Sequence, residues 1–309
     1  MIPKADKPSY NVVKAWRMIH LLPTLAKVAE RIVLMRVAKQ LELEPTQFGS
    51  RTGRGVHDAM ALIFEFLEHN EGMEVAMPTM DVEGGFDKID VGLLCDFMMA
   101  KGCNETLCAW VRRWARCHKV AFRFNGRISK VYHTSKGLPQ GSPLSPFLFR
   151  AYVADIMRPR MIYTPSMRRI VSSYVDDEVV LVAADTRDCA RDMLVDTYRD
   201  CCRVASGRGM GFSVLKTKWI GFGGKWDALE WDGHVSEPVE DLRVLGFRFN
   251  MYANFTAHVD YWLKRGLGVR ARIGALGRRF GGVGGLGAWE TLRLIQSIYL
   301  PLCITALNS

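Results

Sequence analysis

Residues 173–182 read SYVDDEVVLV, which places two aspartates and a glutamate inside an apolar run. Side chains of a regular strand point alternately to opposite faces of a sheet, so Asp176 and Asp177 cannot share a face there. A tight turn between two strands, 170–175 and 178–184, would place both aspartates at an exposed hairpin tip. Aspartate is also a common turn residue without any further role, so an inert turn is the alternative at this point.

A second carboxylate ends another apolar stretch. Residues 73–86 read MEVAMPTMDVEGGF and predict a strand that reaches Asp81 before an acidic, glycine-containing turn. Two strand-end carboxylates in one sheet would form the all-oxygen site that Mg²⁺ prefers. Two such ions, about 3.5–4 Å apart, activate an attacking 3′-hydroxyl and neutralise a leaving pyrophosphate. The two clusters together therefore indicate a polymerase that transfers nucleotides.

The rest of the chain predicts an α+β fold, with at least four strands interleaved with helices in one main domain. Apolar residues recur at helical spacing over 21–41, among them Leu25, Val28, Ile32 and Met35. Period-two alternation around Asn125-Gly126 predicts a hairpin over 121–137. The remaining predicted elements are helices over 56–70, 91–118 and 186–206, a loop running into a helix over 138–157, strands within 211–223 and 242–250, and a largely helical end from 250 that is broken at 277–287.

Composition restricts the classes of partner. The chain has 309 residues, a mass of 34.9 kDa, a net charge of +10 and a pI near 9.3. Its 49% hydrophobic content suits a folded chain with a substantial core. The positive charge favours a partner with many phosphates or an anionic membrane surface, and a basic protein without either partner is the alternative.

Cysteine usage and the chain's apolar runs bear on location. The eight cysteines are scattered without any C-x-x-C pair, which argues against a zinc site and against a disulfide framework. Reduced thiols are typical of an intracellular protein, nuclear or cytoplasmic. The basic N-terminus is not a signal peptide, and no apolar run reaches the length of a membrane helix, so we expect no membrane partner.

Three motifs, in the order expected, resemble those of reverse transcriptases. The turn SYVDDEVVLV is similar to their Y/F-x-D-D motif, DVEGGFDKID (81–90) to their first aspartate motif, and GLPQGSPLSP (137–146) to their nucleotide-pocket loop. Further stretches resemble the non-LTR, LINE-type retrotransposon enzymes. These are MIPKADKP (1–8), WRMIHLLPTLAKVAERI (16–32), QFGSRTGRGVHDAM (47–60), GFSVLKTKWIGFG (211–223) and LRVLGFRFN (242–250).

The resemblance implies a right-hand polymerase fold. It would comprise fingers over 1–70, an antiparallel-sheet palm with the catalytic aspartates over 71–249, and a partial helical thumb over 250–309. The implied activity is RNA-directed DNA polymerisation, which extends a DNA primer with dNTPs on an RNA template. A non-catalytic, truncated remnant that binds nucleic acid is the alternative, and an RNA-dependent RNA polymerase is a second.

The resemblance also implies a metal site. Asp81 and Asp176 would ligate two Mg²⁺ ions, with Mn²⁺ as a substitute, while Asp177 lies adjacent and the Val82 carbonyl completes the coordination. Lys216 corresponds to a lysine that protonates pyrophosphate, although it is also one of two basic residues in a KTK run.

Five residues would contact the incoming nucleotide. Phe86 corresponds to the steric gate that excludes a ribose 2′-hydroxyl and so argues against an RNA polymerase; its alternative is an ordinary core aromatic. Gln140 and Gly141 would lie against the nucleotide, with glycine permitting close backbone approach. Lys4 and Arg17 would hold the triphosphate, although each taken alone is equally compatible with a surface charge.

Four more residues would contact the template or the primer. Arg51 and Arg54 lie in the glycine-rich loop 47–55 and would meet the template backbone, in contacts that weaken with salt. Leu245 and Gly246 fall within the stretch that resembles the primer grip.

The chain departs from the family pattern at several positions. It has Arg-Met-Ile at 17–19, Gly-Ser-Arg at 49–51 and Gly-Gly-Phe at 84–86, and Glu178 follows the aspartates. We expect Glu178 to add negative charge beside Asp177 and to raise carboxylate pKa values there. We also expect a fragment that lacks an upstream finger extension, an endonuclease and a ribonuclease H segment, and that stops inside the thumb.

Overall fold

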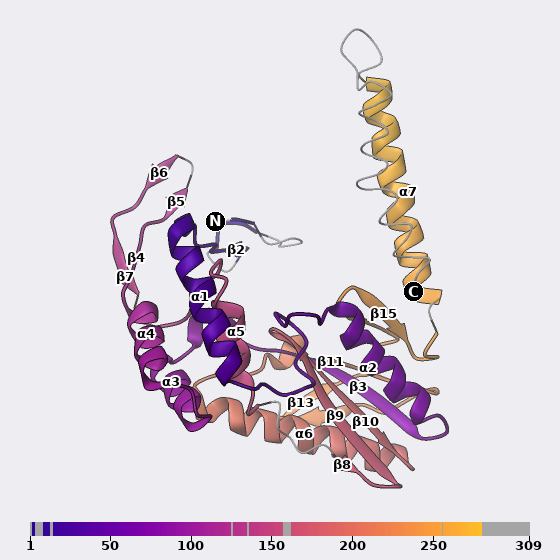
Figure 1. Cartoon of the computed structure of the whole chain (residues 1–309). Coiled ribbons are helices and arrows are strands. Elements are labelled where there is room, and N and C mark those ends of the chain that lie inside the picture. Colours follow the sequence, from indigo (N-terminus) through magenta and orange to yellow (C-terminus); the bar gives the residue numbers. More distant parts are fainter. Residues whose placement is uncertain are drawn as a thin grey trace. The chain divides into compact units, whose positions relative to one another are not determined.

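The computed structural model divides the chain into two units (Figure 1). It describes residues 2–3, 9–12, 15–124, 126–134, 136–156, 162–254 and 256–279. The first unit comprises Met1–Lys218 with Ala228–Ser236, and the second comprises Trp219–Asp227 with Glu237–Ser309. No helix within the described ranges is long and apolar enough to cross a membrane.

An antiparallel sheet forms the core of the first unit. Its strands there are β3 (Glu74–Asp81), β10 (Asp177–Ala184), β9 (Met167–Tyr174) and β8 (Ile162–Tyr163), paired in that order. Every residue of β10 after Asp177 is buried, as expected of a central strand that is covered on both faces and is apolar apart from Glu178. The antiparallel pairing confirms the predicted strands on both sides of the aspartates.

Two helices pack on this sheet. α6 (Arg187–Gly207) lies against β10 and β3, and α2 (Val56–His69) contacts β9. α6 begins where the Thr186 side chain accepts a hydrogen bond from the Cys189 amide, an N-cap that satisfies one free donor of the first turn. These helices confirm the ranges predicted from periodicity.

Four more helices complete the first unit. α3 (Val91–Ala100) and α4 (Glu105–Arg116) begin at the capping residues Asp90 and Asn104. α5 (Ser145–Val153) has a proline in its first turn, as predicted, where its missing N–H costs no intrahelical hydrogen bond. The fourth helix is α1 (Thr24–Gln40).

α1 lies within the predicted range, but it does not bury the apolar residues that predicted it. Leu25, Val28, Ile32 and Met35 are 84%, 50%, 42% and 59% exposed. The opposite side of the helix carries its buried residues, Glu30, Val33 and Val37. Periodicity therefore identified the helix, whereas packing against the rest of the unit selected the other face.

A long hairpin follows α4. β4 (His118–Val120) pairs with β7 (Tyr132–Thr134), and nearer the tip β5 (Arg123–Phe124) pairs with β6 (Arg127–Ile128). This confirms the predicted hairpin, although Asn125 of its turn lies outside the described residues. The short elements of the first unit are β1 (Ile2–Pro3), β2 (Trp16–Arg17), η2 (Gly85–Lys88), η3 (Val214–Lys216), β12 (Leu229–Trp231) and β13 (His234–Ser236).

The second unit contains a hairpin and a helix. The stretch 242–250, predicted as one strand, is two: β14 (Asp241–Val244) and β15 (Phe247–Asn250), joined by a tight turn. Leu245 and Gly246 have φ values of 49° and 96°, which reverse the chain within two residues. α7 (Thr256–Arg279) follows, and the predicted break at 277–287 falls mostly outside the described residues. β11 (Lys218–Gly221) begins at the boundary between the units.

Candidate active site

The two aspartates of the opening motif lie at the tip of the β9–β10 hairpin. Tyr174 pairs with Asp177, which leaves Val175 and Asp176 as a two-residue turn. Val175 has φ 63°, a conformation that a β-branched side chain rarely adopts. Asp176 and Asp177 are both exposed, as expected for a hairpin tip. Such strain persists only where neighbouring structure holds the turn in place.

Asp81 lies opposite this tip on the neighbouring strand. The register pairs Asp81, the last residue of β3, with Asp177, the first residue of β10. Directly opposed residues of antiparallel strands have Cβ atoms about 4.5–5.5 Å apart. The two carboxylate motifs, 96 positions apart in the chain (177 minus 81), therefore meet at one end of the sheet.

Lys216 joins this cluster. Its Nζ donates to Oδ2 of Asp81 at 2.7 Å. Lys216 is the last residue of η3, which begins directly after Ser213. The Ser213 amide in turn donates to the Asp81 carbonyl at 3.0 Å, which holds η3 beside β3. The ion pair is exposed, so it contributes little to stability. Val82 is bridged to Phe212 by two backbone hydrogen bonds, from the Ser213 amide to the Asp81 carbonyl and from the Glu83 amide to the Gly211 carbonyl. The Val82 carbonyl takes no part in these two bonds.

The donor set suits a hard divalent cation. Carboxylate oxygens from Asp81, Asp176 and Asp177 and a backbone carbonyl are the ligands that Mg²⁺ takes in proteins. Over the described ranges no three acidic, histidine or cysteine side chains are gathered tightly enough to hold an ion as they stand. Lys216, bonded to Asp81, supplies the positive charge at that carboxylate. The residues fit the ions chemically, and their side chains would have to turn to bind them.

Glu178 is not part of the exposed cluster. It is 1% exposed, and neither of its carboxyl oxygens has a hydrogen-bond partner. Burial raises the pKa of Glu178 to about 8, so the carboxyl is largely neutral at pH 7. The extra negative charge expected beside Asp177 is therefore absent at neutral pH, because Glu178 belongs to the part of β10 that is covered on both faces.

A loop from the predicted fingers packs directly on the aspartate turn. The Phe48 amide bonds to the Ser173 carbonyl at 2.9 Å, and the Ser173 amide bonds to the Thr46 carbonyl at 3.1 Å. A Cβ on Gly49 would lie 2.5 Å from Cγ2 of Val175 and 2.6 Å from its nitrogen. Only glycine permits this approach, so the loop braces the strained residue before Asp176.

Arg150 anchors the same loop from α5. Its guanidinium, 2% exposed as a residue, donates to the carbonyls of Gln47 at 3.1 Å and Ser50 at 3.2 Å. Burial, with a smaller contribution from Arg51, lowers the pKa of Arg150 to about 10. Sequence reasoning missed this residue, and its signal was a lone arginine in the apolar run FLFRAYV.

The loop 137–146 carries Gln140 and Gly141. The Gln140 carbonyl accepts a hydrogen bond from the His20 amide at 2.6 Å. Gly141 has φ 120°, and a Cβ there would lie 2.5 Å from the His20 carbonyl oxygen. The close approach that glycine permits here is therefore to another part of the chain; contact with a nucleotide stays a prediction.

Buried hydrogen bonds fix this loop to α1. Ser142 donates to Glu30 at 2.6 Å, and the Trp114 indole donates to the other oxygen of Glu30 at 3.0 Å. The Ser142 hydroxyl also accepts from the amides of Leu144 and Ser145 at the start of α5. Glu30, a second residue missed by sequence reasoning, therefore links α1 and α4 to the loop.

Phe86 lies within the first aspartate motif, in η2. Its ring is half-buried, 4.8 Å from that of Phe149 in α5, and its carbonyl accepts from the Leu138 amide at 2.8 Å. The first aspartate motif and the loop 137–146 are thus bonded to each other.

The basic residues predicted to bind substrate are less closely gathered. Arg17 is exposed on β2, and Lys4 lies outside the described residues. Arg51 donates to the Pro45 carbonyl at 3.4 Å, and Arg54 lies 5.6 Å from the centroid of the Phe48 ring. Leu245 and Gly246 belong to the second unit.

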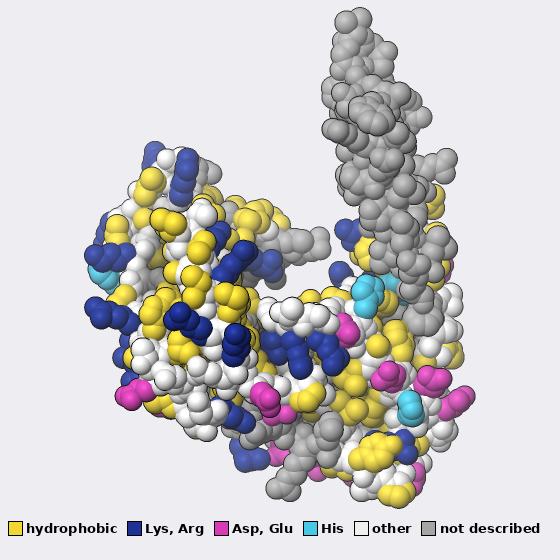
Figure 2. All heavy atoms as spheres, viewed as in Figure 1, with side chains coloured by type: hydrophobic (Ala, Val, Ile, Leu, Met, Phe, Trp, Pro, Cys, Tyr) yellow, Lys and Arg dark blue, Asp and Glu magenta, His cyan; other side chains and the backbone are white. Residues whose placement is uncertain are grey.

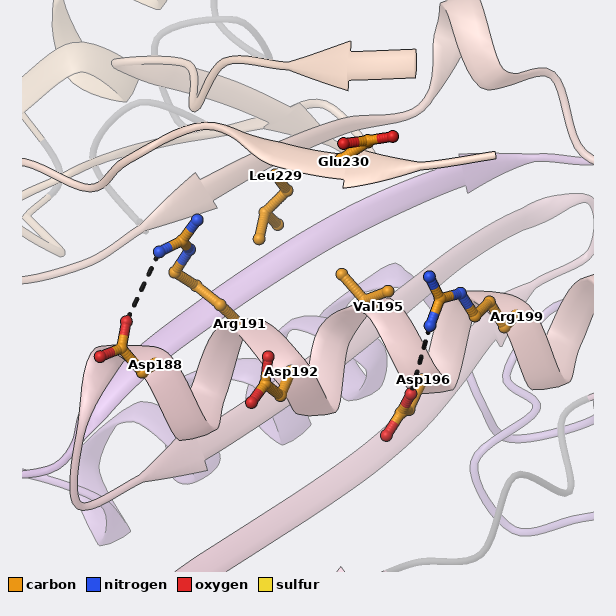
Figure 3. Close-up of a pocket in the computed structure, with 8 residues that line it drawn as sticks. All are labelled: Asp188, Arg191, Asp192, Val195, Asp196, Arg199, Leu229 and Glu230. Atoms are coloured by element: carbon orange, nitrogen blue, oxygen red, sulfur yellow. Dashed lines mark hydrogen bonds and ion pairs between the residues drawn. The ribbon is translucent and has the colours of Figure 1, made fainter. Parts of the chain in front are cut away.

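A cavity of about 430 Å³ lies elsewhere in the first unit, between α6 and β12 (Figure 3). Its arginines are paired with its acids, Arg191 with Asp188 at 3.5 Å and Arg199 with Asp196 at 3.9 Å (Figure 3). None of the predicted site residues lines it.

The comparisons with known proteins agree on one family. The family model for reverse transcriptase (RNA-dependent DNA polymerase) matches residues 2–249. The Transposon TX1 uncharacterized 149 kDa protein of Xenopus laevis is 26% identical over 62% of this chain and 15% of its own length. The probable RNA-directed DNA polymerase from transposon X-element of Drosophila melanogaster is 27% identical over 64% of this chain and 22% of its own length.

A third relative agrees. The RNA-directed DNA polymerase from mobile element jockey of Drosophila funebris is 28% identical over 59% of this chain and 20% of its own length. The chain thus matches only 15%, 22% and 20% of the lengths of these three relatives. Their names confirm the predicted relation to retrotransposon reverse transcriptases.

Two solved structures show the fold. Apo telomerase from Candida tropicalis, truncated of its C-terminal domain, has a TM-score of 0.52 and 10% identity, covering 74% of this chain and 44% of that one. Candida tropicalis telomerase in complex with a fragment of telomeric RNA has a TM-score of 0.53 and 9% identity, covering 92% of this chain and 46% of that one. The predicted polymerase fold is confirmed.

Proposed function

Because the chain belongs to the reverse transcriptase (RNA-dependent DNA polymerase) family, we propose that it extends a primer 3′-hydroxyl with deoxynucleotides on an RNA template. The proposed type is the non-LTR retrotransposon enzyme. The observation that supports it most strongly is the pairing of Asp81 with Asp177 at an exposed sheet end, beside Asp176. Two separate sequence motifs meet there, as a shared cation site requires.

The carboxylates of Asp81, Asp176 and Asp177 and the Val82 carbonyl would hold two Mg²⁺ ions, or Mn²⁺ in their place. Such ions supply an activated 3′-oxygen and neutralise the charge of the leaving pyrophosphate. The protein's contribution is a rigid base, because the apolar strands β3 and β10 fix the backbone from which these side chains project.

Lys216 is proposed as the proton donor to pyrophosphate. Its ammonium already lies at the site, 2.7 Å from Asp81. A protonated amine held beside the departing oxygen transfers its proton as negative charge develops there. Lys216→Met should lower the rate of extension without abolishing template binding.

The pocket for the nucleotide would use both bonded motifs. Phe86 is proposed to exclude a ribose 2′-hydroxyl, and its half-buried ring is backed by Phe149. Gln140 and Gly141 would lie against the nucleotide, while Arg17 and Lys4 would bind its triphosphate. A Phe86→Ala variant should gain ribonucleotide incorporation, measured against deoxynucleotides on the same template.

The remaining contacts concern nucleic acid. Arg51 and Arg54 are proposed to meet the template backbone, and Leu245 and Gly246 the primer strand. The proposed division into fingers (1–70), palm (71–249) and partial thumb (250–309) goes with these roles.

The deciding experiment is primer extension on an RNA template with Mg²⁺, comparing the natural chain with Asp176→Asn. Extension by the natural chain and its loss in the variant would support the proposal. Asp185→Asn, an exposed aspartate at the far end of the same hairpin, is the matched control and should extend normally. If the natural chain binds primer–template but adds no nucleotide, the alternative of a non-catalytic nucleic-acid-binding remnant holds instead.

A further inference from the structure

The hairpin between α4 and the loop 137–146 has an unusual composition. Residues 118–134, here called the basic hairpin, contain no aspartate or glutamate. They carry the cations Lys119, Arg123, Arg127 and Lys130, all of them exposed. The proposed active site uses none of these residues.

Within the part of the chain that the structure describes, the cations of the basic hairpin have no acidic partners. Among the described residues, no ion pair involves any of the four, whereas arginines of α6 pair with Asp188, Asp196 and Asp200. Lys130 instead lies 5.5 Å from the centroid of the Tyr132 ring. Like charges gathered without counter-charges leave a surface that attracts anions.

Aromatic side chains alternate with these cations. Phe122, Phe124 and Tyr132 are 39%, 43% and 42% exposed, and the rings of Phe122 and Tyr132 lie 5.8 Å apart. The Phe124 ring lies 5.4 Å from that of Trp16 in β2. Figure 2 shows hydrophobic and basic side chains interleaved over the arm that β4, β5, β6 and β7 form in Figure 1.

The hairpin holds these side chains in a defined order. Cross-strand pairing places Phe124 opposite Arg127 and Arg123 opposite Ile128. Between the two short ladders, the Ser129 amide bonds to the Phe122 carbonyl at 2.9 Å, and the Phe122 amide bonds to the Ser129 hydroxyl at 2.9 Å. Paired residues share a face, so the Phe124 ring and the Arg127 guanidinium project side by side, whereas Arg123 projects with Ile128 from the other face.

We propose that the basic hairpin is a binding surface for single-stranded RNA. Unpaired bases stack on Phe122, Phe124 and Tyr132, while Lys119, Arg123, Arg127 and Lys130 bind the phosphates. Exposed rings interleaved with cations suit single strands, because bases within a duplex have no free face for stacking. The assignment of this RNA to the template rests on the proposed function.

Binding is measured by fluorescence anisotropy with a labelled, unstructured RNA of about 16 nucleotides. All variants are made in the full chain carrying Asp176→Asn, so that catalysis plays no part. The paired substitution of Phe122 and Tyr132 by alanine should weaken binding by roughly tenfold or more. The paired substitution of Arg123 and Arg127 by alanine should lower the slope of log affinity against log salt by about 1.4, or 0.7 for each phosphate contact.

The matched control replaces Arg199 and Arg203 of α6, an equal charge loss outside the hairpin, and should leave the affinity unchanged. Circular dichroism and thermal unfolding should match the parent chain, because every substituted side chain is exposed. Hairpin variants that bind RNA like the parent would overturn the inference, as would a parent chain without RNA affinity. A hairpin effect seen with DNA of the same sequence and absent with RNA would also overturn it.

This test is separable from that of the proposed function. Failure of primer extension together with hairpin-dependent RNA binding would remove the polymerase proposal and leave the RNA surface standing. Normal extension together with unchanged RNA binding by the hairpin variants would support the polymerase proposal and overturn the inference about the hairpin.

Discussion

Three acidic residues follow one another in the chain, and they occupy two different environments. Asp176 and Asp177 are exposed at the hairpin tip, whereas Glu178 is buried between Met80 and Ser173 of the neighbouring strands. The change occurs within one residue because Asp177 lies at the end of the sheet, whereas β10 is buried from Glu178 onwards. Glu178 therefore affects stability more directly than it affects the charge of the proposed metal site.

Glu178→Gln should flatten the pH dependence of stability. The native carboxyl has a pKa of about 8, against an ordinary value of 4.5, so the folded chain keeps a proton that the unfolded chain has released. The free energy of unfolding is then highest below pH 4.5 and falls as pH rises towards 8, by roughly 3 kcal/mol at pH 7.

The measurement for Glu178 is urea unfolding between pH 5 and pH 8, with exposed Asp185→Asn as the control. The glutamine variant should be more stable than the natural chain at the upper end of this range. An identical pH profile in both chains would show that Glu178 does not hold its proton in the folded state.

At the scale of elements, the glycine-rich loop 47–55 and the aspartate turn support each other. Gly49 touches the strained Val175, and Arg150 of α5 binds the loop carbonyls on the other side. The turn is thus held by this loop and not by the sheet alone. Its position would change if this loop moved by even a fraction of an ångström.

Gly49→Ala should therefore disturb the turn. A Cβ placed 2.5 Å from Val175 forces the loop or the turn to shift, with an expected loss of about 1–3 kcal/mol of stability and most of the polymerase activity. Gly55→Ala is the control in the same loop, since the added Cβ would have its nearest neighbour at 3.9 Å. Thermal unfolding and primer extension measure the two effects, and equal behaviour of the two variants would contradict the contact.

α1 contributes through one buried acid. Glu30 accepts hydrogen bonds from Trp114 and Ser142, so that one carboxylate connects two helices and the loop before α5. The apolar residues on the other side of α1 remain exposed, and they add nothing to this connection.

Glu30→Ala should destabilise the first unit by roughly 2–4 kcal/mol, because the buried Ser142 hydroxyl and the half-buried Trp114 indole lose their acceptor. Glu30→Gln retains an acceptor oxygen and should recover part of that loss. Chemical denaturation of both variants, with exposed Glu42→Ala as the control, gives the comparison. A loss no larger than that of the Glu42 variant would mean that the network contributes nothing measurable.

At the scale of the whole molecule, the net charge of +10 suits a partner that carries many phosphates. Binding of primer–template should weaken with a log–log slope of about −3 or steeper, as expected for four or more phosphate contacts at roughly 0.7 each on single strands. Anisotropy measurements over a salt series test this. An affinity independent of salt would exclude a phosphate-driven interface.

Much of the fold was predictable because its signals are local. The aspartate hairpin, the helices and the start of α5 at its proline all depend on residues close together in the chain. The stretch 242–250 was misjudged as one strand, because a leucine with positive φ at the turn leaves no mark in an apolar pattern. For α1, periodicity predicted a helix but could not show which side the unit would bury.

The sequence by itself determined the family motifs, the two carboxylate clusters and the hairpin that carries Asp176 and Asp177. Only the tertiary structure decided that Asp81 lies opposite Asp177, that Gly49 braces Val175 and that Glu178 faces the core. The physical reason is the range over which each interaction acts along the chain. Backbone sterics and periodicity act over a few residues, whereas strand register and burial depend on which distant segments compete for the same space.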